Sequence, residues 1–113
     1  MRYFETIFLK EAHDFIENQN QKTRMKILYN IDRASQRVDA TLFKKLDDDI
    51  WEFRTRSMGT QIRFLAFWDN RTTAKTLVVA THGFIKKLNL VPQREIERAS
   101  AIRKKYFHDE QNK

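Results

Sequence analysis

Apolar residues in the first third of the chain alternate in one segment and then recur at helical spacing in two others. Residues 2–8 place Phe4, Thr6 and Phe8 on one face and Tyr3, Glu5 and Ile7 on the other, which predicts a first strand. Two helices are expected next, with the polar residues 18–22 as their connection. Their apolar stripes consist of Ala12, Phe15 and Ile16 in the first helix and Met25, Leu28, Ile31 and Ala34 in the second.

Three strands are expected in the second half of the chain, over residues 50–56, 62–68 and 76–84. The acidic residues 47–49 read as a turn before the first of them. Met58-Gly59 and residues 69–73 separate the strands and are short enough for hairpins, so an antiparallel meander follows. Pro92 suits the first turn of a final helix, whose apolar stripe is Ile96, Ala99, Ile102 and Tyr106.

The predicted order is therefore β-α-α-β-β-β-α, a small α+β fold with an antiparallel sheet and the helices packed on one sheet face. At 113 residues we expect one domain spanning 1–113. The chain has no cysteine, which excludes disulfides and thiolate metal sites. The N-terminal residues carry charges throughout, so we expect neither a signal peptide nor a membrane span, and a cytoplasmic location.

Positive charge is concentrated in the second half of the chain. Residues 1–53 hold 9 Lys/Arg and 10 Asp/Glu, whereas residues 54–113 hold 13 Lys/Arg and 5 Asp/Glu. A cationic half beside a near-neutral half favours a surface that binds a polyanion, with an ordinary solvated basic surface as the alternative.

A cluster of basic residues is expected on one sheet face. A turn centred on Met58-Gly59 would place Arg54 opposite Arg63, and one centred on Thr72-Thr73 would place Arg63 opposite His82. Like charges directly opposite one another are destabilising, and a bridging anion would relieve them. Lys86 and Lys87 follow at the same end. As alternatives, Arg54 could simply pair with Glu52, and His82 could be an ordinary core histidine.

No phosphate-binding glycine loop, zinc-protease or serine-hydrolase motif is present, and we expect no metal ion or cofactor. Further basic residues are candidate contacts to RNA or ribosome phosphates, with solvated helix or loop charge as the alternative: Lys44, Lys45, Arg56, Arg94, Arg98, Arg103 and Lys104. Such contacts would fix position without reading sequence.

Four motifs in order along the chain resemble the HigB-like, often phage-derived, branch of the RelE/ParE toxin superfamily. They are Lys45-Leu46, IWEFR at residues 50–54, Ile62-Arg63, and the segment HGFIKKLNLVPQREIERA at residues 82–99. The last carries HxFxKK, then Pro, then EI and Ala at the spacing of that branch. The chain departs from the pattern in its acidic residues 47–49, where a glycine is frequent, and in Leu88 and Leu90, where polar residues are usual.

The resemblance implies a RelE-like fold and the toxin of a type II toxin–antitoxin pair, a ribosome-dependent endoribonuclease that cuts messenger RNA. It also implies a partner antitoxin with a helix-turn-helix, and a complex of the two on operator DNA. Catalytic candidates are Arg54 and Arg63 at the phosphate, aided by Lys86 or Lys87. His82, if accessible to solvent, or a lysine with a lowered pKa, would transfer the proton. The alternatives are a ParE-like inhibitor of DNA gyrase and a non-catalytic basic RNA-binding or phage-derived protein.

Overall fold

Eight helices and strands appear in the computed structural model, which describes residues 2–72 and 76–111. In chain order they are β1 (Glu5–Phe8), α1 (Lys10–Glu17), α2 (Gln21–Gln36), β2 (Phe43–Lys45), β3 (Trp51–Ser57), β4 (Thr60–Asp69), β5 (Leu77–Ile85) and α3 (Gln93–Gln111). The α+β class is confirmed, and the order is consistent with the RelE-like fold that the resemblance implies. Among the described helices, none is long and apolar enough to cross a membrane.

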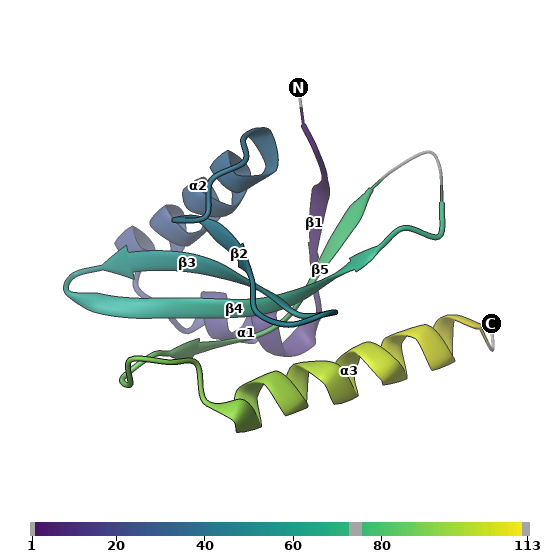
Figure 1. Cartoon of the computed structure of the whole chain (residues 1–113). Coiled ribbons are helices and arrows are strands. Elements are labelled where there is room, and N and C mark those ends of the chain that lie inside the picture. Colours follow the sequence, from purple (N-terminus) through teal and green to yellow (C-terminus); the bar gives the residue numbers. More distant parts are fainter. Residues whose placement is uncertain (1, 73–75, 112–113) are drawn as a thin grey trace.

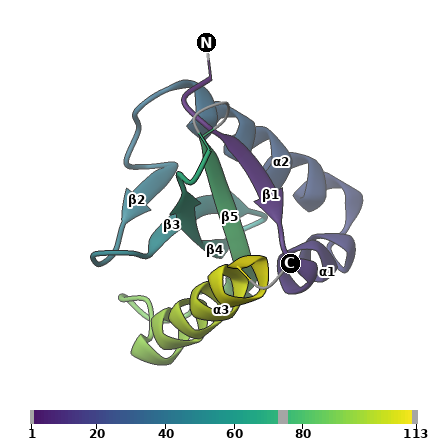
Figure 2. The same ribbon diagram turned by 90° about the vertical axis from the view of Figure 1, so that its right-hand side faces the viewer.

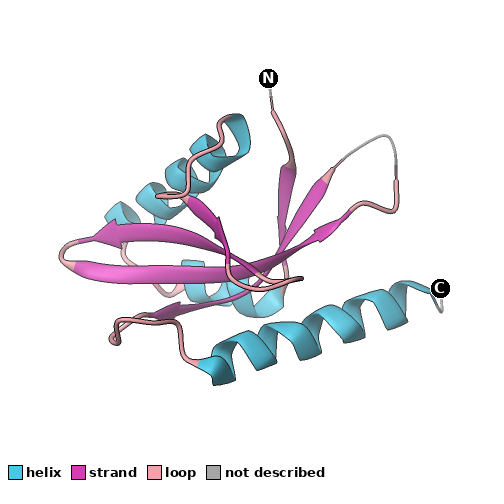
Figure 3. Ribbon diagram, in the orientation of Figure 1, coloured by secondary structure: helices cyan, strands magenta, loops and turns pink. Residues whose placement is uncertain are grey.

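The five strands form one sheet in the order β1-β5-β4-β3-β2 (Figures 1 and 3). The meander of β3, β4 and β5 is antiparallel, as predicted. The prediction of a wholly antiparallel sheet is wrong at β1, which pairs in parallel with β5. The strand β2 was not predicted, because a three-residue strand with two exposed lysines leaves no alternating pattern to recognise.

The helices cover both faces of the sheet, so the prediction that they share one face is wrong. Helices α1 and α2 pack on one face and α3 packs on the other (Figure 2). The reason lies in β4, where residues 62–67 are all buried. Successive strand side chains point to opposite faces, so a strand in which every residue is buried requires cover on both sides.

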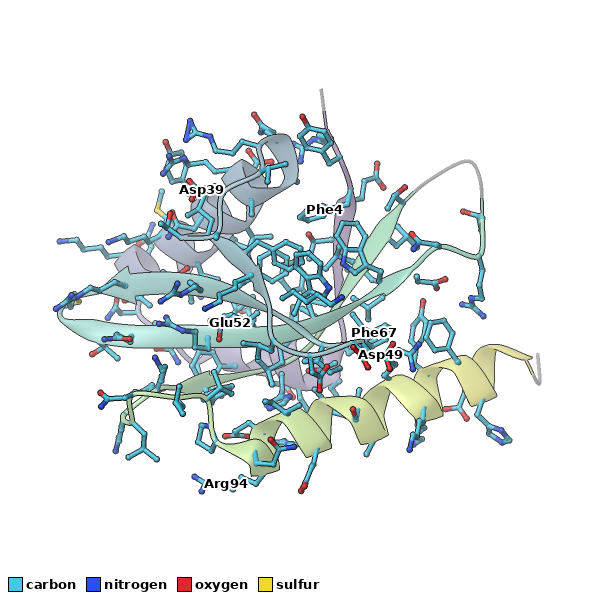
Figure 4. The ribbon with its side chains drawn as sticks, in the orientation of Figure 1. Phe4, Asp39, Asp49, Glu52, Phe67 and Arg94 are labelled. Carbon is cyan, nitrogen blue, oxygen red and sulfur yellow. The ribbon has the colours of Figure 1, made fainter. Side chains whose placement is uncertain are left out.

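The core on the α1/α2 side is rich in aromatic rings from four strands and the chain before β1. Phe43 stacks on Phe53 with ring centroids 4.4 Å apart, and Phe4 meets Trp68 edge-on at 5.3 Å. Figure 4 shows Phe4 among these rings and Phe67 on the opposite side, toward α3. The stripe predicted for α1 is confirmed, with Ala12 and Ile16 buried and Phe15 packed against them.

Helix α2 buries a different stripe from the predicted one. Ile27, Ile31 and Ala34 are buried, at spacings of four and three residues. Met25 and Leu28, which were assigned to that stripe, are 63% and 46% exposed. Both stripes contain the same C-terminal residues, and only the packing on the sheet shows that Ile27 continues them toward the N-terminus.

Two glycines serve different structural needs on the meander. Gly59 and Met58 form a two-residue turn with φ of 78° and 52°, the combination that tight hairpins favour, and the predicted turn centre is confirmed. Gly83 instead allows close packing, because a Cβ there would lie 2.6 Å from Phe64 Cε1 and 2.8 Å from Phe15 Cδ1.

Helix α3 packs on Leu65, Phe67 and Val79 through its buried Ala99. Ile96 and Tyr106 of the predicted stripe lie against this second core. The Tyr106 hydroxyl donates to Asp69 Oδ2 over 2.9 Å. Hydrogen bonds from Arg71, and then that from Tyr106, lower the pKa of Asp69 to about 2 against the cost of burial. Pro92 directly precedes α3, and its carbonyl accepts from the Glu95 amide.

Candidate functional site

Five cationic side chains lie on the α3 side of the sheet, toward the end where the β3–β4 hairpin extends past the start of α3 (Figure 1). We call them the cationic face: Lys44, Arg54, Arg56, Arg63 and Lys86. The pairing of the strands sets their places. Lys44 lies opposite Glu52, Arg54 opposite Arg63, and Arg56 opposite Gln61. The Lys86 amide donates to the Gln61 carbonyl, which extends the ladder past β5.

The predicted pairing of Arg54 with Arg63 is confirmed, whereas that of Arg63 with His82 is wrong. Arg63 lies opposite Phe84. Pairing of Asp69 with Leu77 already shifts the register by one residue from the predicted one. A bulge at Thr81, between the Leu65–His82 and Ala66–Ala80 pairs, shifts it by another. A shift of two residues preserves the face, so His82 stays on the same sheet face as Arg63. It lies opposite Leu65, two residues further along β4. The predicted turn centre includes Thr73, which lies outside the described residues.

Glu52 sits buried between the two arginines. Its Oε1 lies 3.5 Å from Arg54 Nε and its Oε2 lies 3.7 Å from Arg63 Nε. The alternative pairing of Arg54 with Glu52 is therefore present, but the carboxylate is shared. Within the described residues, neither Glu52 Oε2 nor Arg63 Nε has a hydrogen-bond partner. Because one carboxylate faces two guanidinium groups, positive charge remains in excess.

The two arginines differ in their access to solvent. The Arg63 side chain is 4% exposed, and it donates to the Ile62 carbonyl over 3.1 Å and to Gln61 Oε1 over 2.9 Å. Burial lowers the pKa of Arg63, with Glu52 opposing and Arg54 adding to the shift. The Arg54 side chain is 33% exposed. Of these two arginines, Arg54 is therefore the one that can contact a phosphate directly. Arg63 adds positive charge beneath it.

The pKa of Lys86 is lowered from its usual value, which is the direction that favours proton transfer nearer to neutral pH. Burial is the largest cause of its shift, followed by Arg63, while Glu52 opposes it and Arg54 and Lys44 add to it. The direction agrees with the expectation of a lysine crowded by cations. Lys87, the other lysine proposed for this role, is exposed.

His82 lies beneath this surface. The residue is 1% exposed, and its ring is held by Thr81 Oγ1 at 2.9 Å and by Glu95 Oε1 at 3.2 Å. Burial lowers the pKa of His82, with Arg98 adding to the shift and Glu95 opposing it. The catalytic role assigned to His82 required solvent access, and the buried ring does not meet that condition. Its contacts fit a residue that fixes the start of α3 to β5.

A groove of about 470 Å³ opens beside the cationic face. Its lining includes Arg54 and Arg63, and among the described lining residues none is acidic. Half of the lining is cationic: Lys26, Arg33, Arg54, Arg56 and Arg63. We call it the basic groove. Lys26 and Arg33 come from α2 and were not among the predicted site residues, and neither was Glu52, although strand alternation places Glu52 on the face of Arg54.

The remaining basic candidates are dispersed. Lys44 and Lys45 lie on β2, not on a helix or loop, and only Lys44 shares the cationic face. Arg98 pairs with Glu11, and Arg103 lies 3.6 Å from Asp49. Arg94 and Lys104 are exposed on α3, and Figure 4 shows Arg94 pointing away from the sheet. The structure does not bring these α3 residues to the cationic face.

Comparison with known proteins identifies one family. The family described as "Phage derived protein Gp49-like (DUF891)" matches residues 14–104, which include every residue of the cationic face and of the basic groove. No curated protein matches the chain closely enough to count as a relative. Because the match covers most of the chain, the protein belongs to the Gp49-like family of phage-derived proteins.

Proposed function

We propose that this protein is the toxin of a type II toxin–antitoxin pair and cuts messenger RNA on the ribosome, in the manner of HigB and RelE. Its partner is an antitoxin that carries a helix-turn-helix, and operator DNA is bound only by their complex. The protein acts in the cytoplasm. The family of phage-derived proteins and the four sequence motifs support this placement within the toxins.

The observation that carries the proposal is the cationic face itself. Buried or half-buried cations around one carboxylate cost free energy, and a bound polyanion offsets that cost. The partly exposed Arg54 on β3, the Arg63 beneath it on β4 and Lys86 directly after β5 lie together. A phosphodiester is the polyanion unit that such a cluster fits, because its negative charge increases during cleavage.

The cleavage uses the RNA's own 2′-hydroxyl as nucleophile. A bond forms between the 2′-oxygen and phosphorus, the bond from phosphorus to the 5′-oxygen breaks, and a cyclic phosphate remains. The 2′-hydroxyl proton passes to water. Arg54 stabilises the negatively charged phosphorane, and Arg63 holds Glu52 and adds positive potential from below. Lys86 in its protonated form donates to the departing 5′-oxygen.

Pulse labelling in cells tests the proposal against its rivals. Induced expression of the protein should stop incorporation of labelled amino acid within minutes, before incorporation of labelled thymidine falls. The Arg54→Ala variant should leave both unaffected. The matched control is Arg37→Ala, an exposed arginine at the end of α2 outside the basic groove, which should behave as wild type.

Loss of DNA synthesis first, with translation intact, would favour inhibition of DNA gyrase. Free growth of cells that accumulate the folded wild-type protein without an antitoxin would favour a non-catalytic role. Equal toxicity of the wild type and Arg54→Ala would mean that the cationic face is not required for toxicity.

A further inference from the structure

Helix α2 adds a polar stripe to the wall of the basic groove. Lys26, Asn30 and Arg33 all line the groove. They follow one another at spacings of four and three residues, which places them along one side of the helix. The buried stripe of Ile27, Ile31 and Ala34 is one residue further along, so the sheet contact itself orients the polar stripe. We call Lys26, Asn30 and Arg33 the α2 arm.

Two side-chain hydrogen bonds fix helix α2 against β3. Asn30 Nδ2 donates to Thr55 Oγ1 over 3.3 Å, and Thr23 Oγ1 and Ser57 Oγ share a buried hydrogen bond of 2.9 Å. Lys26 lies between Thr23 and Asn30 along the helix. The helix positions that carry Lys26 and Arg33 are therefore set relative to Arg54, because they belong to a helix that is bonded to β3.

The edge of β3 is open on this side. Strand β2 pairs with β3 only over Trp51–Phe53, and the Arg54 amide adds one bond to the Leu42 carbonyl. Beyond that point no strand among the described residues pairs with this edge, and the Thr55 and Ser57 side chains bond to α2. A continuous path thus leads from the cationic face over Arg56 to the α2 arm.

Positive charge extends along this whole path. Arg54 and Arg63 belong both to the cationic face and to the basic groove. Asp39 is the acidic neighbour of Arg33, and its carboxylate already accepts from the Thr41 amide and hydroxyl. Arg33, which lines the groove, also lies over the Tyr29 ring at 5.5 Å, and this contact restricts the positions of its guanidinium.

We infer that the α2 arm is a second phosphate-binding subsite, at which Lys26 and Arg33 hold the backbone of a single-stranded RNA next to the scissile phosphate. This inference rests on the proposed function, since the scissile phosphate lies at Arg54. The groove of about 470 Å³ is within the size range of pockets that hold small ligands of nucleotide size. Contacts to phosphate alone would position the strand and read no bases, as expected for an enzyme whose substrate is presented by the ribosome.

Salt-dependent binding of a short RNA tests the subsite. The probe is a fluorescent twelve-nucleotide polyuridine in which every 2′-hydroxyl is methylated, so that it cannot be cut. Its affinity for the full chain is measured by anisotropy over a range of salt concentrations. Each lost phosphate contact should reduce the slope of log affinity against log salt by about 0.7 for single strands. Lys26→Ala and Arg33→Ala should each give this loss, and the double variant about twice as much.

Matched controls are Arg37→Ala and Lys10→Ala, the latter at an exposed lysine of α1 outside the basic groove. Both should keep the wild-type slope. Unchanged slopes in the Lys26 and Arg33 variants, or no binding of the probe by the wild type, would overturn the subsite. So would weakened binding of polyglutamate with unchanged binding of RNA, because that result assigns the α2 arm to an acidic protein partner.

Cleavage on ribosomes separates this inference from the proposed function. If the wild type and the α2 variants cut equally well while Arg54→Ala does not, the function stands and the subsite fails. If the wild type does not cut at all, the function fails, and the slopes still decide whether the α2 arm binds RNA.

Discussion

Phe64 and Arg63 are neighbours on β4, and both are buried, yet they face two very different surroundings. Phe64 is 1% exposed and points toward α1, where it meets the Phe15 ring edge-on at 5.4 Å. Arg63 points to the other face, among Glu52, Arg54 and Lys86. Burial of the phenylalanine removes apolar area from water, which stabilises the fold. Burial of the arginine removes a charge from water, which costs free energy.

The difference indicates what each face does. The α1/α2 side is packed with rings and explains how so small a chain holds its shape. The open end of the α3 side contains buried charged residues. Replacing such residues with apolar ones of similar size often makes a protein more stable. We therefore expect changes on the first face to affect stability and changes on the second to affect activity, and each prediction below tests that division.

Arg54→Ala should have the largest effect. Loss of one donor to a charge that develops in the transition state lowers the rate by about 10²–10³-fold in comparable sites. Thermal stability should change little, because the side chain is one-third exposed and Glu52 keeps Arg63. Single-turnover cleavage on programmed ribosomes measures the rate, and thermal unfolding checks the fold. A rate within a few-fold of wild type would place the chemistry elsewhere.

Lys86→Arg should come next, because arginine keeps the charge but does not release its proton. The expected loss of rate is about 10²-fold if Lys86 donates a proton. Burial and the neighbouring cations lower the pKa of Lys86 from its usual 10.5. The wild-type rate should therefore fall with rising pH sooner than an ordinary lysine would allow, and the variant should lack that decline. Identical pH profiles in both proteins would mean that Lys86 contributes only its positive charge and does not donate a proton.

Gly83→Ala probes the other face. The new Cβ would lie 2.6 Å from Phe64 Cε1, so rings must shift, and overpacking of this kind costs about 1–3 kcal/mol of unfolding free energy. Urea unfolding measures the loss, and Gly59→Asn serves as control because asparagine tolerates the left-handed turn. The folded variant should cut RNA at a normal rate. A large loss of rate without a loss of stability would contradict the division of the two faces.

Lys104→Ala should have the smallest effect, a few-fold weaker binding to the ribosome with an unchanged rate once bound. Lys104 is exposed on α3 and lies outside the cationic face. A contact to phosphate at the rim weakens binding and reduces its salt dependence without touching the chemistry. Ribosome co-sedimentation at two salt concentrations measures the binding. A slower cleavage rate on saturated ribosomes would contradict this prediction, because it would mean that α3 contributes to the chemical step.

Much of the fold follows from the sequence, because long strands and helices carry strong periodic patterns. The meander, the Met58-Gly59 turn and the pair of Arg54 with Arg63 were all predicted correctly. Strand β2 was missed because three residues carry no period. The place of α3 could have been inferred from the unbroken apolar run of β4, which leaves both sheet faces in need of cover.

The site was less predictable, since it depends on register and on side chains from distant elements. A one-residue offset at the Asp69–Leu77 pair and the bulge at Thr81 together moved His82 away from Arg63, and no pattern of apolar residues marks either of them. Lys26 and Arg33 were missed because their position depends on which side of α2 meets the sheet. That side became known only when Ile27, and not Leu28, was found buried.

The central claim is that the cationic face cuts messenger RNA on the ribosome, and mapping of the cuts tests it most directly. Purified protein is added to a defined messenger RNA with and without translating ribosomes, and the 5′ ends are mapped by primer extension for the wild type and for Arg54→Ala. We expect cuts in register with codons, only with ribosomes, and lost in the variant. Cuts by both proteins alike, or no cuts by the wild type, would contradict the account.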